Sequence, residues 1–378
     1  MPDVFEIAEI LVSHAVRAHP DEVAIIAYYG SHAKGTASPT SDLDIFYIPD
    51  AGKAGSLCSQ FIIDGLPYDF WPVSWQLAED IAHARSGRPW AVSASLIADA
   101  QVLYHRSTQD LMRFEALQAR IAALTRPEGR PLMVAKALDA FKDTLFQLGQ
   151  MRLAAAGDDG AGLHWAGQKF VDSAVNCLAL VNQTYFSKGW GANLSEIFRL
   201  PRRLDGLREM MHAILLPQGP DDALAQAAQL ARGVREILRQ AQAALAEPQD
   251  ARQVFQDFYF FVLEYKHKVL SACAREDKIA ARYAATLLQQ ELCQMMNKVT
   301  QGFYGTDFNL LGEYVGGYQE VGFPDLLAPA SQGNLETLAR RTRALDEKVQ
   351  AWFERHTIRR NVLTDEEVLR RFLARDPL

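Results

Sequence analysis

The first hundred residues alternate between helical and strand periods of hydrophobicity. Apolar residues recur at helical spacing from Val4 to Ala15, which predicts a helix over residues 3–18. Four short apolar or alternating runs predict strands, at residues 23–29, 42–48, 61–63 and 68–73. A turn through Asp64 and Gly65 would join the last two strands. This part of the chain is therefore expected to mix helices with a small sheet.

From about residue 130 the apolar pattern is helical throughout. The face from Val134 to Leu148 predicts a long helix that ends near GDDGAG at 157–162. Further helices are expected over residues 163–186, 222–247, 252–273, 276–300 and 335–356. The predicted fold class is α+β, with a small mixed-sheet domain followed by an all-α helical-bundle region. TRPEGRP, at 125–131, is the expected linker.

The helical region contains a pattern that suggests two related helical units. The segments that begin at Asn182 and Asn297 share an order of landmarks: aromatic residues with glycine, Asn-Leu near a glutamate, and a leucine pair before proline. The expected domains are therefore residues 1–125, 126–250 and 251–378. A chain of 378 residues is long enough for two or three cores.

Composition narrows the classes of partner. The formal net charge is −7, whereas proteins that bind nucleic acid usually carry an excess of positive charge. Nucleic acid is therefore disfavoured as a partner. The four cysteines form no C-x-x-C pair, so neither a zinc site nor a disulfide framework is expected. The expected location of the protein is the reducing cytoplasm. No apolar run reaches the length of a membrane span. A homodimer is compatible with the sequence.

The clearest chemical signal is a pair of acids in SDLDIF. Asp42 and Asp44 are two apart on a predicted strand, so their side chains would share one face. Two adjacent carboxylates repel each other unless a cation lies between them. Mg²⁺ suits this position because it binds carboxylate and phosphate oxygens together. Alone, such a pair is more typical of a solvated strand edge.

A glycine and serines accompany the acids. Gly30 and Ser31 stand where the strand at 23–29 ends and a helix is expected to start, so backbone N–H groups could approach a phosphate there. Ser41, directly before the acids, is a second candidate phosphate donor. His32 and Lys34 lie in the same loop, and a solvated loop lysine is the favoured interpretation of Lys34.

A third acid is expected on a later strand. Asp69 is flanked by aromatic residues in YDFWPV, a poor place for a charge without a purpose. If its strand pairs beside the first acidic strand, Asp69 joins Asp42 and Asp44 as a metal ligand and general base. Asp64 and Asp80 are nearby competitors for this role, although Asp64 also suits a turn.

These elements, in the order IIAYYGS, SDLDIF and YDFWPV, resemble the DNA polymerase β-like nucleotidyltransferase superfamily. The helical region that follows looks like that of the bacterial antibiotic nucleotidyltransferases of the aminoglycoside type. The resemblance implies that Gly30 and Ser31 hold the β- and γ-phosphates, and that Asp42, Asp44 and Asp69 bind two Mg²⁺ ions. Related enzymes bring a helix lysine to the α-phosphate, for which Lys142 and Lys169 are candidates.

The resemblance implies transfer of a nucleoside monophosphate from ATP, or another NTP, to a hydroxyl group, with release of pyrophosphate. Three acceptor hypotheses follow. The first is a small molecule such as an aminoglycoside-like compound. The second is a protein or RNA hydroxyl, as in toxin–antitoxin AMP transferases. The third is a non-catalytic nucleotide-binding scaffold, against which the intact acids argue.

Overall fold

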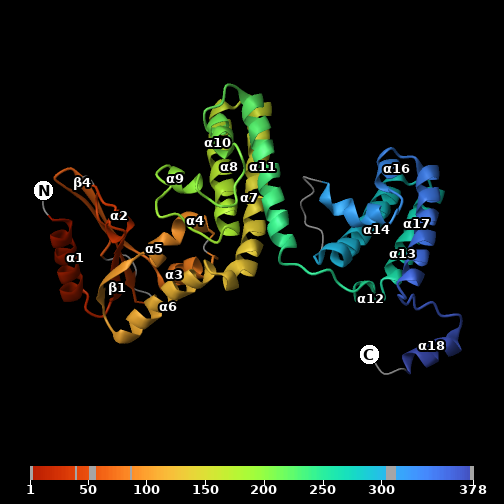
Figure 1. The fold of residues 1–378 in the computed structure, drawn as a ribbon, viewed down its shortest axis with the longest axis horizontal. Coiled ribbons are helices and arrows are strands. Elements are labelled where there is room, and N and C mark those ends of the chain that lie inside the picture. Colours follow the sequence, from red (N-terminus) through yellow and green to blue (C-terminus); the bar gives the residue numbers. More distant parts are fainter. Residues whose placement is uncertain (1–2, 39–40, 51–56, 86, 304–311, 375–378) are drawn as a thin grey trace. The chain divides into compact units, whose positions relative to one another are not determined.

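The computed structural model describes residues 3–38, 41–50, 57–85, 87–303 and 312–374 of the chain. Two compact units are present, Met1–Ala241 and Gln242–Leu378 (Figure 1). The first unit begins with a small mixed sheet and continues as helices, and the second is helical where described. The predicted α+β fold class is therefore confirmed.

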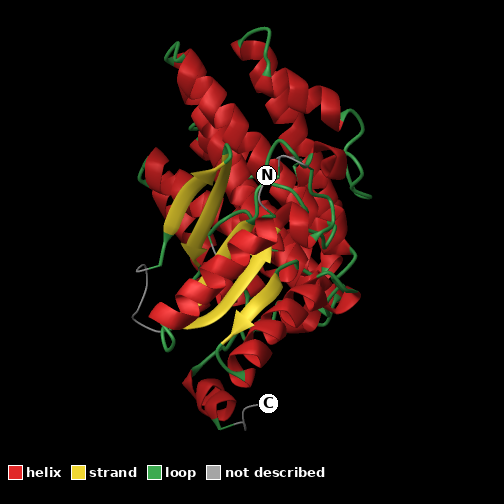
Figure 2. Ribbon diagram, turned by 90° about the vertical axis from the view of Figure 1, so that its left-hand side faces the viewer, coloured by secondary structure: helices red, strands yellow, loops and turns green. Residues whose placement is uncertain are grey.

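One five-stranded sheet forms the centre of the N-terminal region (Figure 2). Its strands are β1 (Val23–Tyr29), β2 (Asp44–Pro49), β3 (Ser59–Ile63), β4 (Leu66–Pro72) and β5 (Gln101–His105). They lie in the order β3-β4-β2-β1-β5. β2 runs parallel to β4, and the other neighbouring pairs are antiparallel.

Two features predicted next to the sheet, the first helix and the turn between β3 and β4, follow from their local sequence. The expected first helix is α1 (Val4–Ala18), and the Asp3 carboxylate caps it by accepting a hydrogen bond of 2.9 Å from the Phe5 N–H. Asp64 and Gly65 join β3 to β4 with φ angles of 50° and 81°. Two positive φ angles in a two-residue loop match the twist of a hairpin, so the predicted turn is confirmed.

The second strand begins two residues later than expected. Asp44 pairs with Tyr29, the last residue of β1, and the chain then bends away at Gly30. Because β1 ends there, Asp42 has no register partner on it and lies in the segment before β2. The prediction that Asp42 lies on the strand was therefore wrong, because the strand begins two residues later, at Asp44.

The other helices of the first unit surround the sheet or continue beyond it. They are α2 (Gly30–Ala33), α3 (Trp75–Ala82), α4 (Trp90–Ser93), α5 (Ser95–Ala98), α6 (Thr108–Leu124), α7 (Arg130–Ala156), α8 (Gly160–Val181), α9 (Leu194–Ile197), α10 (Leu207–Leu215) and α11 (Pro220–Ala243). A short 3₁₀ turn, Pro127–Gly129, occupies the expected linker. α7 and α8 pack along each other, and the break predicted at 157–162 separates them (Figure 1).

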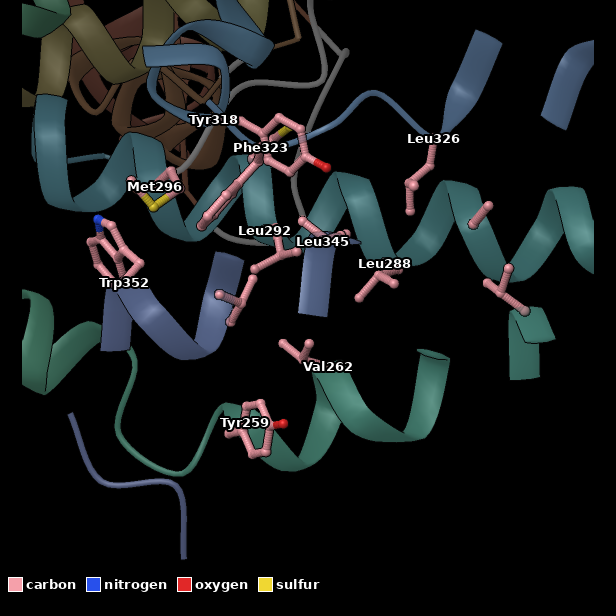
Figure 3. Close-up of a cluster of buried hydrophobic side chains, with 14 of the residues drawn as sticks. Tyr259, Val262, Leu288, Leu292, Met296, Tyr318, Phe323, Leu326, Leu345 and Trp352 are labelled. Atoms are coloured by element: carbon pink, nitrogen blue, oxygen red, sulfur yellow. The ribbon is translucent and has the colours of Figure 1, made fainter. Parts of the chain in front are cut away.

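The second unit has its own apolar core. Its helices are α12 (Ala251–Val254), α13 (Tyr259–Ala274), α14 (Lys278–Gln301), α15 (Gly316–Glu320), α16 (Leu327–Ser331), α17 (Leu335–Arg355) and α18 (Glu366–Leu373), with a 3₁₀ turn at Glu313–Val315. Figure 3 shows Val262, Leu292 and Leu345, from three of these helices, meeting in the core. The helix expected over 252–273 is interrupted, because Asp257 adopts a φ of 58° between α12 and α13.

Two further expectations concern the repeat of helical units and the absence of membrane spans. The second of the two similar segments contains residues 304–311, which lie outside the described residues, so the relation between the helical units stays a prediction. Among the described residues, every helix is too short or too polar to cross a membrane.

Candidate active site

One row of cross-strand neighbours brings the predicted acids together. Asp44 on β2 lies in register with Asp69 on the parallel strand β4. The row continues to Tyr29 on β1 and to Gln60 on β3. Residues directly opposite each other share a face of the sheet, and the Gln60 side-chain amide donates to the Asp69 carboxylate at 3.3 Å. The pairing that would join Asp69 to the first acids is therefore present.

The three acids share one electrostatic environment. Burial first, and then the like charges of Asp42 and Asp69, raise the pKa of the Asp44 carboxyl from 3.8 to about 6. His32 and Lys34 act in the opposite direction without cancelling the rise. Carboxylates whose charged forms oppose one another in this way are typical of functional sites rather than structural ion pairs.

Gly30 makes room for one of these carboxylates. Its φ is +78°, a left-handed conformation that glycine adopts without strain. A Cβ atom placed on it would lie 2.4 Å from Asp44 Oδ2, closer than any real contact. Both the backbone conformation and the approach of Asp44 therefore require glycine at this position.

The bend after β1 is held by short hydrogen bonds within the loop. Thr36 N–H donates to the Ser31 carbonyl at 2.9 Å, and His32 Nε2 lies 3.3 Å from the Ser41 carbonyl. Ser41 Oγ accepts from the Ser38 N–H at 2.9 Å. These contacts tie Ser31 and Ser41 into one loop, and the predicted binding of phosphate by Gly30, Ser31 and Ser41 stays a prediction.

Lys34 is not the solvated lysine that the sequence favoured. Its ammonium group lies 3.1 Å from Asp99 Oδ2, and its side chain is only 14% exposed. It also donates to the carbonyl of Ser187, in the loop after α8. The interpretation failed because both partners are distant in sequence, so local pattern gave no sign of them.

Lys142 and Lys169 line one cavity of about 610 Å³, with Trp90 and Trp190. Gly30 and the three acids are not among the residues that line it. Lys142 lies 3.0 Å from Asp139 in an exposed ion pair. Lys169 Nζ lies 5.5 Å from the centre of the Trp165 ring. The two lysines thus line the same cavity, and their proposed contact with phosphate stays a prediction.

The acids suit Mg²⁺ bound together with a substrate. In the part of the chain that the structure describes, no three His, Cys, Asp or Glu side chains are already gathered around one ion position. Mg²⁺ in phosphate-handling sites is usually held by one or two carboxylates and the substrate's phosphates, not by an all-protein cage. The crowding of Asp42 and Asp69 against Asp44 is the charge that such a cation would offset.

Two residues of the row, Tyr29 and Gln60, were not predicted from the sequence. Burial and the nearby Asp44 raise the pKa of the Tyr29 hydroxyl, so this group stays protonated beside the acids. Its position as the last residue of the strand before Gly30 was the available signal.

Three comparisons with known proteins bear on this site. Residues 112–244 match the KNTase C-terminal domain family. No curated protein matches the sequence. One solved structure, described as a nucleotidyltransferase-like protein from Exiguobacterium sibiricum 255-15, is 12% identical and covers 62% of this chain and 74% of that chain. Its TM-score of 0.37 is too low to establish a common fold. The family match supports the coarser of the sequence-based expectations, that this chain is related to nucleotidyltransferases.

Proposed function

We propose that this protein transfers a nucleoside monophosphate, AMP from ATP, to a hydroxyl group of a small molecule and releases pyrophosphate. The observation that carries the proposal is the register of Asp44 with Asp69 beside the glycine bend. It places two of the three acids beside the bend at which the sequence resemblance implies phosphate binding. The KNTase C-terminal domain match in the following helices supports the same class of reaction.

Asp42, Asp44 and Asp69 would hold Mg²⁺, which would neutralise the triphosphate and the charge that develops on the leaving pyrophosphate. Gly30 has no side chain of its own to cover the bend, so its backbone N–H groups would be able to approach phosphate oxygens closely. Ser31 and Ser41 would add hydroxyl donors to the same phosphates. The row thus supplies negative charge for the cation, while the bend supplies neutral donors for the nucleotide.

Asp69 is the best placed residue to accept the proton of the acceptor hydroxyl. It is half-buried at the row, and Gln60 holds one of its oxygens at 3.3 Å. A carboxylate oriented in this way would serve as general base once an acceptor hydroxyl lies within hydrogen-bond distance of it. Asp44 is less suited to this role, because Gly30 packs directly against its Oδ2.

The body of the acceptor would bind in the cavity that Lys142 and Lys169 line, and its reacting hydroxyl would have to extend out of that cavity to Asp69, which does not line it. Its volume of about 610 Å³ falls in the range of small-molecule pockets. Its lining carries both charges: lysines suited to a nucleotide phosphate, and Asp139, Asp143 and Asp172, which suit an amine-bearing acceptor. An aminoglycoside-like compound would suit a cavity that is lined by both charges and by tryptophans.

The experiment uses ATP labelled at the α-phosphate, Mg²⁺ and a panel of aminoglycosides, other small hydroxyl compounds, proteins and RNAs. We expect label on a small molecule, and we expect Asp42→Asn and Asp44→Asn to lower the rate on the order of 1000-fold, as loss of a preorganised electrostatic group can. Asp205→Asn changes an exposed aspartate before α10 and serves as the matched control. Full activity in both purified site variants, with the fold intact, contradicts the assignment.

A further inference from the structure

Lys34 forms the most enclosed ion pair near the phosphate bend. Its side chain is 14% exposed and that of Asp99 is 21% exposed, with 3.1 Å between Nζ and Oδ2. By contrast, the Lys142–Asp139 pair has side chains that are 58% and 69% exposed. Exposed pairs contribute little to structure, whereas a partly buried pair is screened less by solvent and salt. The Lys34 contact can therefore fix the backbone that carries it.

Asp99 is itself held in place. The Tyr185 hydroxyl donates to Asp99 Oδ1 at 2.8 Å, leaving Oδ2 for Lys34. Asp99 follows α5 and lies two residues before β5, whose Gln101 pairs with Tyr28 on β1. The carboxylate thus stands just before β5, the strand that neighbours the one ending at the bend. It provides Lys34 with a fixed partner.

The second contact of Lys34 is equally anchored. Glu196, on α9, accepts hydrogen bonds from both the N–H and the hydroxyl of Ser187, at 2.7 Å and 2.9 Å. One residue earlier, the Phe186 N–H donates to the Ala91 carbonyl at 2.6 Å. Lys34 therefore joins the loop after β1 to a loop that α4 and α9 already hold.

We propose, resting on the function proposed above, that Lys34 is a positioning residue that holds the Gly30–Ser31 bend in its phosphate-binding geometry through Asp99 and Ser187. The alternative role, direct contact with a phosphate, would require Lys34 to leave two anchored partners. Its charge is already matched by Asp99, so the bend retains only backbone and hydroxyl donors for the nucleotide.

A double-mutant cycle in the full chain separates the two roles. If Lys34 positions the bend, Lys34→Met and Asp99→Asn each lower kcat/KM for Mg·ATP, on the order of 100-fold, mainly through kcat. The double variant is then no worse than either single variant, because both remove one interaction. Lys34→Arg, which keeps the charge, recovers part of the loss. If Lys34 binds phosphate, Asp99→Asn frees it and leaves ATP affinity unchanged or tighter, and that result overturns the proposal.

A second measurement does not depend on activity. Hydrogen exchange of the Gly35 and Thr36 amides, which close the bend onto His32 and Ser31, should become faster in both single variants. Arg239→Met, which breaks the Arg239–Glu236 pair on α11, is the control and should leave these amides unchanged. Unchanged exchange in Lys34→Met refutes the positioning role even in an active enzyme. If exchange becomes faster in the two single variants but the unchanged protein transfers no label, Lys34 positions the bend and the proposed transferase function is wrong.

Discussion

Asp44 in the first unit and Asp346 in the second are both aspartates among aromatic side chains, yet their carboxylates have opposite electrostatic surroundings. Asp346 is 4% exposed and receives three donors: the Tyr259 hydroxyl at 2.9 Å, the Lys266 ammonium group and the Gln350 amide at 3.0 Å. Asp44 instead faces the like charge of Asp69 across the sheet. One carboxylate is satisfied within the fold, and the other is not.

The difference is the one expected between a structural carboxylate and a carboxylate that binds a cation, the role proposed for Asp44. A buried charge in a stable core needs a counter-charge and hydrogen bonds, which Asp346 has. A site that must bind a cation has to keep negative charge uncompensated until the cation arrives. Under the proposed function, Asp44 is a cost to folding that cation binding would offset, so removing the carboxylate should have opposite effects on stability at the two positions.

The largest expected effect is at Asp346. Asp346→Ala leaves the Lys266 ammonium group and the Tyr259 hydroxyl without their acceptor in a mostly buried cluster. We expect the free energy of unfolding to fall by about 3 kcal/mol, as when one partner of a buried ion pair is removed. Urea denaturation measures it. Glu264→Ala, which removes an exposed i,i+4 pair with Lys268 on α13, is the control and should change it little. Equal effects of the two substitutions would show that Asp346 is no more structural than a surface residue.

A smaller loss is expected at the bend. Gly30→Ala forces a side chain into a left-handed conformation, which costs roughly 1–2 kcal/mol, and pushes its Cβ against Asp44 Oδ2. We expect about 2 kcal/mol of destabilisation together with loss of label transfer.

Gly35→Ala is the matched control for Gly30→Ala. Gly35 also has a positive φ, of +65°, but a Cβ there would meet no atom within 4 Å. Thermal unfolding should report a similar backbone cost for both variants, while transfer should fail only in Gly30→Ala. Equal loss of transfer would mean that loop conformation, not the approach of Asp44, controls the site.

The sequence predicted the parts of the site that depend on local pattern. Gly30 at a strand end and two acids separated by one residue are visible in a few neighbouring positions. The start of β2 was predicted two residues early because strand propensity alone does not reveal where the partner strand stops.

Register and long-range pairing could not be predicted in the same way. Asp69 meets Asp44 only because β4 pairs parallel to β2 with the β3 hairpin outside it. Lys34 finds its partners at Asp99 and Ser187, through contacts between segments that no periodicity relates. Such contacts are set by how the elements pack, and the charge pattern of the loop resembles that of any solvated turn.

The smallest predicted effect has the opposite sign from the others. Because the pKa of Asp44 is raised from 3.8 to about 6 in the folded chain, the folded state binds more protons between these pH values than the unfolded state does. Stability associated with this group is therefore fully present below pH 3.8 and is lost as pH rises through about 6. Asp44→Asn removes the loss, so without Mg²⁺ it should stabilise the protein by about 1–2 kcal/mol at neutral pH, after allowance for solvent screening.

At pH 4 the difference between Asp44→Asn and the unchanged protein should be small, because Asp44 is then largely protonated in the folded chain. Adding Mg²⁺ with ATP should stabilise the unchanged protein and not the variant, since only the former keeps the carboxylate that the cation offsets. Thermal unfolding at several pH values, with and without Mg·ATP, gives both results. A variant that is less stable than the unchanged protein at pH 7.5 in EDTA would place Asp44 with Asp346, as a carboxylate that the fold needs, and would remove the reason to assign a cation to the row.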